Sequence, residues 1–552
     1  MVRVRGGAAL CILLGACAST SLDPVRFRNQ APVSVVNDRQ PIPKPNRPSF
    51  ALLLYHLDNF LFRRLTRVME VPVPSRARNV NSLDEVPDSS WFVNRIGVRE
   101  LSLDELRRGP NRDAGPDTSA PWHVLGTKVG GKSPGLLIKD ARGQKFLLKF
   151  DKPEAPDTET GADVVGQRLL WALGYYTPED SIVFFTRAKL ALSPQAVVKD
   201  FFDNERPMRP RDLDEVLSRV DQRPDGSYRG LASRFLSGAL LGGYWPEGVR
   251  EDDPNDRIPH EDRRDVRGQY VFFAWLGHTD IKPDNTLDVW VEDPTDASRH
   301  HVQHYLIDFG QALGVTGVVE RVAADGYSHA AFDFQYAPLS MISLGLWKRP
   351  WEGANAPPLR GVGRFESEHF DPGAWKAQYP FIPWARMDDF DGFWAAKLVM
   401  RFSPQQIRAA VEAGRFDDAR AVDYLTRVLV ERQRKTGAYW FARVNPLDGF
   451  QLVGGDLCFQ DLWLSYGLGQ AADTRYRAQA YDFEGRAIGW QASADGAART
   501  CFRGLSPTRD HEGYLIVSIE TERDRRRLPP VLVHMAIDPT TRALRVIGLR
   551  RQ

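Results

Sequence analysis

The sequence predicts an α+β protein with a separate C-terminal β-rich unit. Apolar residues recur at helical spacing from about residue 386 to 436, where Phe393, Ala396 and Met400 share one face. Short apolar runs at 514–519 and 531–535 are instead typical of strands. With 552 residues, of which 42% are hydrophobic and 26% charged, the chain is long enough for about two to four domains with buried cores.

The charge balance excludes one class of partner. The chain has 73 Lys and Arg residues against 71 Asp and Glu, a net charge of +2, so we expect no nucleic acid partner. Beyond the N-terminus, no stretch approaches the ~20 apolar residues that a membrane span needs.

The first residues read as a targeting signal. Arg3 and Arg5 precede an apolar run at 8–14, the length expected of a secretory signal. The run ends in Leu-Gly-Ala-Cys17, which resembles the bacterial lipobox. The resemblance implies a signal peptide over 1–17, acylation of Cys17 and a membrane partner through this lipid anchor. An ordinary signal peptide with an incidental cysteine is the alternative.

The same resemblance sets the expected compartment. Ala18 follows Cys17 in place of Asp, which in the lipoprotein pattern favours the outer membrane of the bacterial cell envelope. A body held there, facing the periplasm, meets oxidising conditions. Cys458 and Cys501, the only cysteines of the body, are then either bonded or two separate thiols.

The elements follow in chain order. The proline-rich stretch 18–48 suits a tether, and the apolar spacing over 50–71 predicts an amphipathic helix that docks on the body or on lipid. Residues 135–149 predict a hairpin with a glycine turn, and 162–174 a helix with a glycine stop. Residues 263–276 predict a second helix.

A strand is expected over 301–307, after a polar insertion, and it runs into Asp308-Phe-Gly310. His300, His301 and His304 lie at its start. A polar cluster there is a solvated loop or, as the alternative, a metal site.

The segment His278-Thr-Asp280-Ile-Lys282-Pro-Asp-Asn285 carries the strongest chemical signal. At average amino-acid frequencies a His-x-Asp-x-Lys-x-x-Asn pattern arises by chance in a chain of this length about once in a thousand. Phosphoryl transfer requires a carboxylate beside the acceptor hydroxyl, cations on the phosphates and oxygen ligands for magnesium. Asp280, Lys282, Asn285 and Asp308 together provide these groups.

These residues resemble the catalytic loop and metal-binding motif of the protein-kinase-like superfamily. The resemblance implies that Asp280 is the base or orients the acceptor, and that Lys282 neutralises the transferring phosphate. It implies that Asn285 and Asp308 ligate Mg²⁺ or Mn²⁺. The cofactor would be ATP or another nucleotide.

The resemblance also requires a nucleotide-binding lysine and an acid that positions it. Lys149 ends the second strand of the hairpin, and Asp163, near the start of the following helix, has a placement similar to the acid of HipA-like kinases. Glu159 is the competing acid.

A glycine-rich segment precedes the hairpin, and Gly130, Gly131 and Lys132 within it are candidates to lie over the phosphates. An ordinary glycine-rich turn is the alternative, because the spacing matches neither the protein-kinase loop nor the P-loop.

Departures from the family place the chain away from ordinary protein kinases. Thr279 stands where they have arginine, Asp163 is one methylene shorter than the usual Glu, and no Ala-Pro-Glu follows Gly310. The segment Ile307-Asp-Phe-Gly-Gln-Ala-Leu-Gly314 more closely resembles the HipA-like and phosphatidylinositol-kinase-like branches. The expected fold is a two-lobed protein-kinase-like body with the C-terminal β-rich unit. Its expected divisions are a tether and docking helix at 18–85, a small lobe at 86–200, a large lobe at 201–438 and the β-rich unit at 439–552.

The resulting hypothesis is a lipid-anchored envelope protein with a kinase-like phosphotransferase site. The phosphoryl acceptor is unknown: a lipid, a sugar, a small molecule or a protein. Transfer of AMP also occurs on this fold. The alternative is a catalytically inactive kinase-fold binding protein of the cell envelope.

Overall fold

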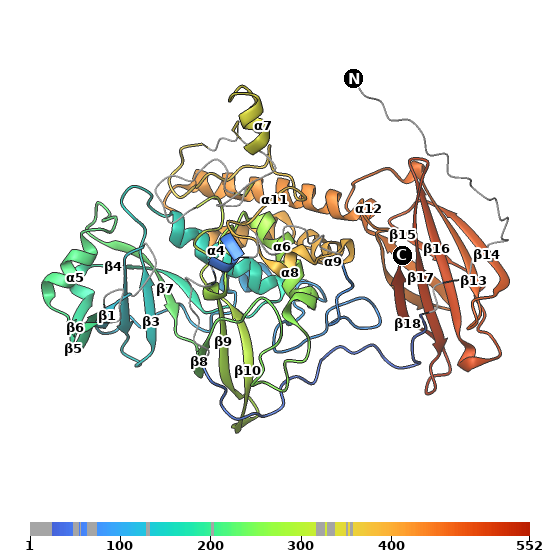
Figure 1. Ribbon diagram of the computed structural model, residues 1–552, viewed down its shortest axis with the longest axis horizontal. Helices are drawn as coiled ribbons and strands as arrows, with labels where there is room; N and C mark the ends of the chain where they lie inside the picture. The colour runs from blue at the N-terminus through green and yellow to red at the C-terminus, as the bar shows by residue number, and fades with distance from the viewer. Residues whose placement is uncertain are drawn as a thin grey trace. The chain divides into compact units, whose positions relative to one another are not determined.

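The computed structural model is an α+β protein with two compact units (Figure 1). The described residues up to Pro32, Leu447–Ser465 and Gly469–Gln552 form the C-terminal unit, and the described residues of Val33–Pro446 with Tyr466–Leu468 form the main unit. The structure describes residues 22, 25–47, 55, 57–62, 74–128, 133–199, 204–315, 326–327, 337–348, 352–353 and 357–552.

A seven-stranded sheet organises the first half of the main unit, in the order β4-β7-β3-β2-β1-β5-β6. The strands are β1 (Trp122–Thr127), β2 (Gly135–Lys139), β3 (Lys145–Lys149), β4 (Asp180–Phe185), β5 (Leu190–Lys199), β6 (Glu205–Pro207) and β7 (Tyr228–Arg234). The hairpin expected over 135–149 is confirmed as β2 and β3. Its turn is closed by the Asp140 carboxylate, which accepts the Gln144 N–H at 2.8 Å, and by Gly143 at φ 79°.

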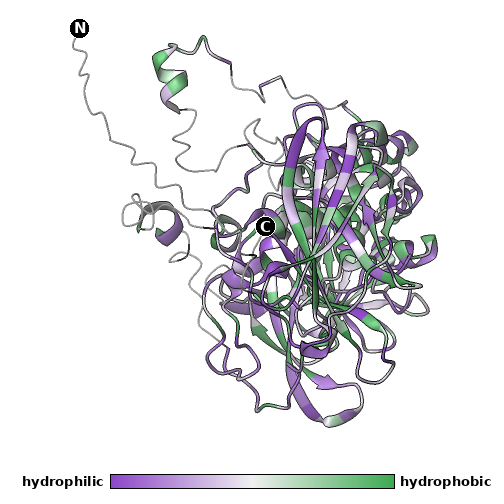
Figure 2. Cartoon of the chain, turned by 90° about the vertical axis from the view of Figure 1, so that its right-hand side faces the viewer, coloured by the Kyte–Doolittle hydropathy of each residue, from purple (hydrophilic) through white to green (hydrophobic). Residues whose placement is uncertain are grey.

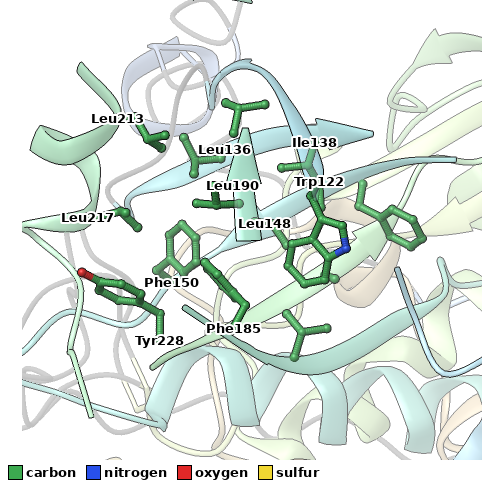
Figure 3. Packing of buried hydrophobic residues seen from close by; sticks show 14 of the residues in the cluster. Trp122, Leu136, Ile138, Leu148, Phe150, Phe185, Leu190, Leu213, Leu217 and Tyr228 are labelled. Atoms are coloured by element: carbon green, nitrogen blue, oxygen red, sulfur yellow. The ribbon is translucent and has the colours of Figure 1, made fainter. Parts of the chain in front are cut away.

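The sheet extends past the small-lobe boundary expected at residue 200. Strand β7 lies between β3 and β4, so the segment from 205 to 234 belongs to the same sheet. Helix α5 (Pro210–Leu217) adds Leu213 and Leu217 to the core shown in Figure 3. Sequence pattern shows that a segment is a strand but not which strands it joins, so the boundary was misplaced.

The two faces of this sheet pack against different parts of the main unit. Phe146 and Leu148 of β3 point into the core shown in Figure 3. The alternation of a strand therefore places Lys149 on the opposite face, with its cross-strand partner Leu231. Leu231 packs there against Val164 of helix α4 (Thr158–Leu173). The two-residue alternation of β3 therefore places the Lys149 side chain between the sheet and α4.

Helix α4 begins four residues before the expected 162–174. Its first turn is polar, so apolar spacing does not reveal it. The turn is held instead by Asp151, whose carboxylate accepts the Thr160 N–H at 3.0 Å and pairs with Arg229 at 3.0 Å. All three residues are buried, and a satisfied buried polar network replaces apolar contacts there.

Helices α6 (Arg264–Leu276), α9 (Asp389–Met400), α10 (Pro404–Glu412) and α11 (Ala419–Phe441) form the second half of the main unit, as expected from apolar spacing. Short helices α3 (Leu103–Arg108) and α8 (Ile382–Ala385) pack beside them. Buried Asp391 of α9 pairs with Arg264 at 2.9 Å and Arg267 at 3.2 Å, which joins α9 to α6.

The polar insertion expected before the 301–307 strand is a hairpin. Strands β9 (Thr286–Asp293) and β10 (Asp296–Leu306) pair antiparallel, and β8 (Ala239–Gly242) pairs with β9. The first residues of β10 are exposed, so they need no apolar side chains, and this is why they resemble a loop in sequence.

The stretch 18–48 is not a free tether in its described part, residues 22 and 25–47. Asp38 accepts the Ser90 N–H at 3.0 Å, and the Ile42 N–H donates to His300 O at 2.9 Å, both within the main unit. Residues 22 and 27 contribute apolar side chains to the core of the C-terminal unit. Proline-rich composition predicts an extended chain, but not that its backbone groups find distant partners. Of the helix expected over 50–71 only residues 55 and 57–62 are described, and they include a helical turn, Asp58–Phe62.

The C-terminal unit is β-rich. Strands β11 (Leu447–Val453), β12 (Asp456–Asp461) and β15 (Arg499–Phe502) form one sheet. Strands β13 (Thr474–Tyr481), β14 (Ala487–Asp495), β16 (Leu515–Arg523), β17 (Arg526–Ile537) and β18 (Leu544–Arg551) form a second, and α12 is Leu462–Ser465. The unit begins at Leu447 instead of residue 439, because α11 continues to Phe441.

Cys458 and Cys501 are joined by a disulfide between the paired strands β12 and β15. The bond closes a loop with a sequence separation of 43, for which chain entropy allows up to ~4 kcal/mol of stabilisation. Replacing both cysteines by Ala is expected to lower the free energy of unfolding of the full chain by up to that amount. Reductant should lower the melting temperature of the parent and leave that of the double variant unchanged. Two free thiols found by mass mapping of the full chain, purified without reductant, would contradict the bond.

Within the described ranges, no helix combines the length and apolar character that a membrane crossing requires.

Candidate functional site

Lys149 is the centre of a buried ion-pair cluster. Its ammonium nitrogen lies 2.9 Å from Asp163 Oδ2 and 2.8 Å from Asp308 Oδ1. Burial would lower the pKa of Lys149, but the two carboxylates outweigh burial and hold it well above its ordinary value. The group is therefore a permanent cation. The expected contact between Lys149 and Asp163 is confirmed, and Glu159 instead accepts a hydrogen bond from Ser133.

Asp163 links the helix, the strand and the Asp308 segment. It projects from the middle of α4, and its Oδ1 accepts the Phe309 N–H at 3.1 Å. Gly166, one turn later, leaves room for Phe309, because a Cβ there would lie 2.9 Å from Phe309 Cβ. The buried Phe309 and Asp163 thus fix the backbone on both sides of Asp308.

Asp308 has an unusual backbone and a partly open side chain. Its φ is 63°, in the left-handed region that residues other than glycine rarely adopt, at a cost of about 1 kcal/mol or more. The side chain remains 45% exposed although Oδ1 is paired with Lys149. The turn buries Phe309 and leaves Asp308 facing the open side of the cluster.

The electrostatics show which cations surround this carboxylate. Burial would raise the pKa of Asp308, but Lys149, then Lys128 and Lys282, hold it well below its usual range. Asp308 is therefore ionised at neutral pH. Lys128 precedes the hairpin in the sequence and Lys282 lies in the loop after α6, and both favour the charged form of this carboxylate.

The loop after α6 brings the second group of candidates to the same place. Helix α6 ends at Gly277, in the left-handed conformation, and the loop turns through Asp280 and Lys282. The Lys282 ammonium lies 2.7 Å from Asp280 Oδ2, and Gln311 Nε2 donates to the same oxygen at 2.9 Å. Gln311 follows Gly310 directly, so this bond ties the loop to the Asp308 segment.

Asn285 completes that connection. Its side-chain amide donates to Asp280 O at 2.7 Å, and its backbone carbonyl accepts the Ile307 N–H at 3.0 Å. The described part of the chain gives the side-chain oxygen of Asn285 no hydrogen-bond donor, and it gives none to Asp308 Oδ2.

His278 supports the loop from behind. It is buried, its ring stacks on Phe273 with centroids 4.6 Å apart, and Phe309 meets it edge-on at 6.2 Å. Burial lowers the pKa of His278 to about 4, so the ring is neutral at neutral pH. Its place in the motif is explained by packing against Phe309.

Two side-chain oxygens of the cluster could take part in holding a metal ion. Among the described residues no group of three or more His, Cys, Asp or Glu side chains could hold a metal ion. Mg²⁺, however, is commonly bound by one or two carboxylates together with phosphate oxygens and water. Asp308 Oδ2 and Asn285 Oδ1 are two oxygens without protein donors on neighbouring segments, so they suit a metal that arrives with phosphate.

His300, His301 and His304, the alternative metal site, belong to no metal-holding group among the described residues. His304 Nδ1 bonds Asp288 at 2.6 Å and its ring stacks on Trp91 at 3.6 Å, while the ring of His300 stacks on Trp290 at 4.0 Å. These histidines are engaged in hairpin packing.

Lys128 is a site residue that the sequence reading missed. Its N–H donates to Gly135 O at 3.0 Å, and Gly135 pairs across the sheet with Lys149. Lys128, Gly135 and Lys149 therefore form one row on the α4 face, and the glycine in the middle has no side chain to separate the two lysines. A Cβ at Gly135 would lie 3.0 Å from Lys128 Cβ and Cδ. The sequence carried no signal for this position, because Lys128 is placed opposite Gly135 by the pairing of β1 with β2.

Lys128 differs from Lys149 in its partners. Burial first and the neighbouring Lys149 second lower the pKa of Lys128, although Asp308, Glu159 and Asp163 act in the opposite direction. Among the described residues, no carboxylate forms an ion pair with the Lys128 amine. Its amine could therefore bind an anionic group such as a phosphate.

Gly130, Gly131 and Lys132, the candidate phosphate loop, and Cys17 lie outside the described residues. Comparison of the chain with protein-family models, curated proteins and solved structures gives no match.

Proposed function

We propose that the main unit is a kinase-like phosphotransferase that uses a nucleotide and a divalent metal. One observation carries the proposal: Lys149, Asp163 and Asp308 form a single ion-pair cluster, and Gln311 and Asn285 join the Asp280 loop to that cluster. These are the cation, carboxylates and oxygen ligands that phosphoryl transfer requires. In this proposal the sheet with α4 is the small lobe, and the helices α6 and α9 to α11 form the large lobe.

Each residue has a distinct task in the proposed site. Lys149, held by Asp163, binds phosphate oxygens, and Asp308 with Asn285 would hold Mg²⁺ or Mn²⁺. The metal when bound would neutralise phosphate charge. Asp280 accepts the proton of the acceptor hydroxyl or orients that hydroxyl, and Gln311 and Lys282 fix its carboxylate. Lys282 is also a cation for the transferred phosphate.

We further propose that the chain is lipid-anchored in the bacterial cell envelope, at the outer membrane. Its phosphoryl acceptor would then be a molecule of the envelope. The direct test is transfer of label from nucleotide to an envelope extract in the presence of Mg²⁺ or Mn²⁺. Label on the terminal phosphate reports phosphoryl transfer, and label on the first phosphate reports AMP transfer. A chain that binds nucleotide but transfers neither label would be the inactive kinase-fold binding protein.

Lys128→Met is expected to weaken nucleotide binding by roughly 10- to 100-fold, because a hydrogen bond to a charged group contributes about 1.5–3 kcal/mol. Lys128→Arg should retain most of the affinity. Lys139→Met, which removes an exposed lysine of the same sheet, is the matched control. A Kd for Lys128→Met equal to that of the control would show that Lys128 does not contact the nucleotide.

Cys17→Ser is expected to abolish incorporation of labelled fatty acid into the chain, since the lipobox resemblance assigns acylation to this thiol. Cys11→Ser, six residues earlier in the same signal segment, should keep the label. Label that persists in Cys17→Ser, or that is absent from the parent, would remove the anchor from the proposal.

A further inference from the structure

The segment 337–348 carries the most exposed large apolar side chains of the described chain. Met341 is 75% exposed, Ile342 81%, Leu344 91% and Leu346 87%, and Leu339 beside them is 47% exposed. We call these five residues the apolar tip. Figure 2 shows hydrophobic residues along its short helix α7 (Ala337–Ile342). Clustered exposure of this kind marks an interaction surface, whereas single exposed apolar residues do not.

The tip is shaped by local hydrogen bonds. The Ser343 N–H donates to Leu339 O at 3.1 Å, and the Gly345 N–H donates to Ser340 O at 3.0 Å. Leu344 and Gly345 both have positive φ, 52° and 82°, which turns the chain at the end of α7. The Trp347 N–H then donates to Ser343 Oγ at 3.0 Å. This turn, and not burial, holds Leu344 and Leu346 outward.

The surrounding sequence has the chemistry of a membrane interface. From residue 334 to 351 there is no Asp or Glu, although charged residues make up 26% of the chain. Trp347, Lys348, Arg349 and Trp351 follow the apolar residues directly. Tryptophan favours the headgroup level of a bilayer, and Lys and Arg are attracted to anionic headgroups.

The same charge pattern argues against a symmetric contact between two copies. In such a contact the patch faces itself, so the basic residues of one tip would meet those of the other. An anionic lipid surface offers both an apolar interior for the leucines and opposite charge for Lys348.

The residues before and after the apolar tip in the sequence lie close to the candidate site. Gly314 is six residues after Asp308, and its carbonyl oxygen accepts the Arg364 N–H at 2.9 Å. Further on, the Gln378 N–H donates to Thr279 O at 2.8 Å, next to Asp280. The tip is therefore carried by a chain segment that both starts and ends at the residues of the site.

We propose that the apolar tip inserts into the interfacial layer of a bilayer containing anionic lipid, as a membrane contact separate from the acylated cysteine. Leu344 and Leu346 enter the acyl region, and Lys348 pairs with headgroups. The contact needs neither nucleotide nor phosphoryl transfer, so its failure would leave the proposed function untouched.

The test uses the full chain with Cys11 and Cys17 replaced by Ser, so that Leu346→Cys gives one free thiol beside the bonded Cys458 and Cys501. An environment-sensitive fluorophore is placed on that thiol, and vesicles of phosphatidylethanolamine and phosphatidylglycerol are added. Val98→Cys, at an isolated apolar residue that is 67% exposed in the same unit, is the matched control. With vesicles, the Leu346 probe is expected to shift to shorter wavelength and to be quenched by brominated acyl chains. The Val98 probe is expected to do neither.

A second variant tests whether the leucines cause insertion. Leu344→Glu in the labelled chain should lower the fraction of inserted probe by roughly 10- to 100-fold, the value expected for losing one buried leucine. Val98→Glu should have no effect. No quenching of the Leu346 probe by lipid would overturn the proposal. A blue shift that appears without vesicles and grows with protein concentration would overturn it in favour of a contact between copies.

Discussion

Asp308→Asn is expected to abolish metal-dependent nucleotide binding. The substitution keeps the size of the side chain but removes the charge that both pairs with Lys149 and offers its second oxygen to a metal. Lys149 keeps Asp163 at 2.9 Å, so the small-lobe cluster retains an ion pair and the fold should survive. Titration of the full chain with nucleotide and Mg²⁺ or Mn²⁺ measures the loss.

The matched control for this prediction is Asp104→Asn. The Asp104 side chain is 94% exposed on α3 of the same unit, so the variant loses one carboxylate without touching the site. It should bind nucleotide like the parent. If Asp308→Asn also binds like the parent, Asp308 is not a metal ligand and the proposed site is wrong.

Asp280→Asn should leave nucleotide binding largely intact and lower turnover by a factor of roughly 10² to 10⁴, the usual contribution of a positioned acid–base group. Its carboxylate is held by Lys282 and Gln311 and carries no contact to Lys149 in the structure. The effect should therefore fall on kcat and not on the nucleotide Kd. Label-transfer rates under saturating nucleotide measure it.

Asp284→Asn is the control for that experiment, because Asp284 is an exposed acid of the same loop. Its turnover should stay within a few-fold of the parent. Equal turnover of Asp280→Asn and Asp284→Asn would exclude Asp280 as the catalytic residue.

The candidate site could be predicted where local pattern determines position. The motif from His278 to Asn285 is contiguous, and the two-residue period of β3 sends Lys149 to the face opposite its core residues. Asp163 was assigned through the resemblance to HipA-like kinases, with Glu159 as the competing acid. The choice between the two acids needed the structure, in which the Lys149 ammonium lies 2.9 Å from Asp163 Oδ2.

Lys128 could not be placed in this way. It reaches the site through the pairing of β1 with β2, which contains an irregularity between Val124 and Gly126. Such a shift changes the face on which every later residue lies, and sequence pattern does not reveal it. The same limit applies to β7, whose place between β3 and β4 depends on pairing with residues far away in the chain.

Polar segments were the other source of error. The start of β10 and the first turn of α4 are stabilised by pairing and by buried hydrogen bonds, so they lack apolar periodicity. The proline-rich stretch 25–47 likewise finds its partners in Ser90 and His300. Composition reports only on the segment itself, whereas the structure of the segment depends on hydrogen bonds to residues far away in the sequence.

The measurement that tests the central claim most directly is the electron paramagnetic resonance of Mn²⁺ added to the purified full chain with and without nucleotide. Asp308 and Asn285 supply only two oxygens, so tight Mn²⁺ binding is expected only when nucleotide phosphates complete the site. The account predicts a bound-Mn²⁺ signal with nucleotide, its loss in Asp308→Asn and its persistence in Asp104→Asn. Absence of any ternary complex of chain, Mn²⁺ and nucleotide would contradict it.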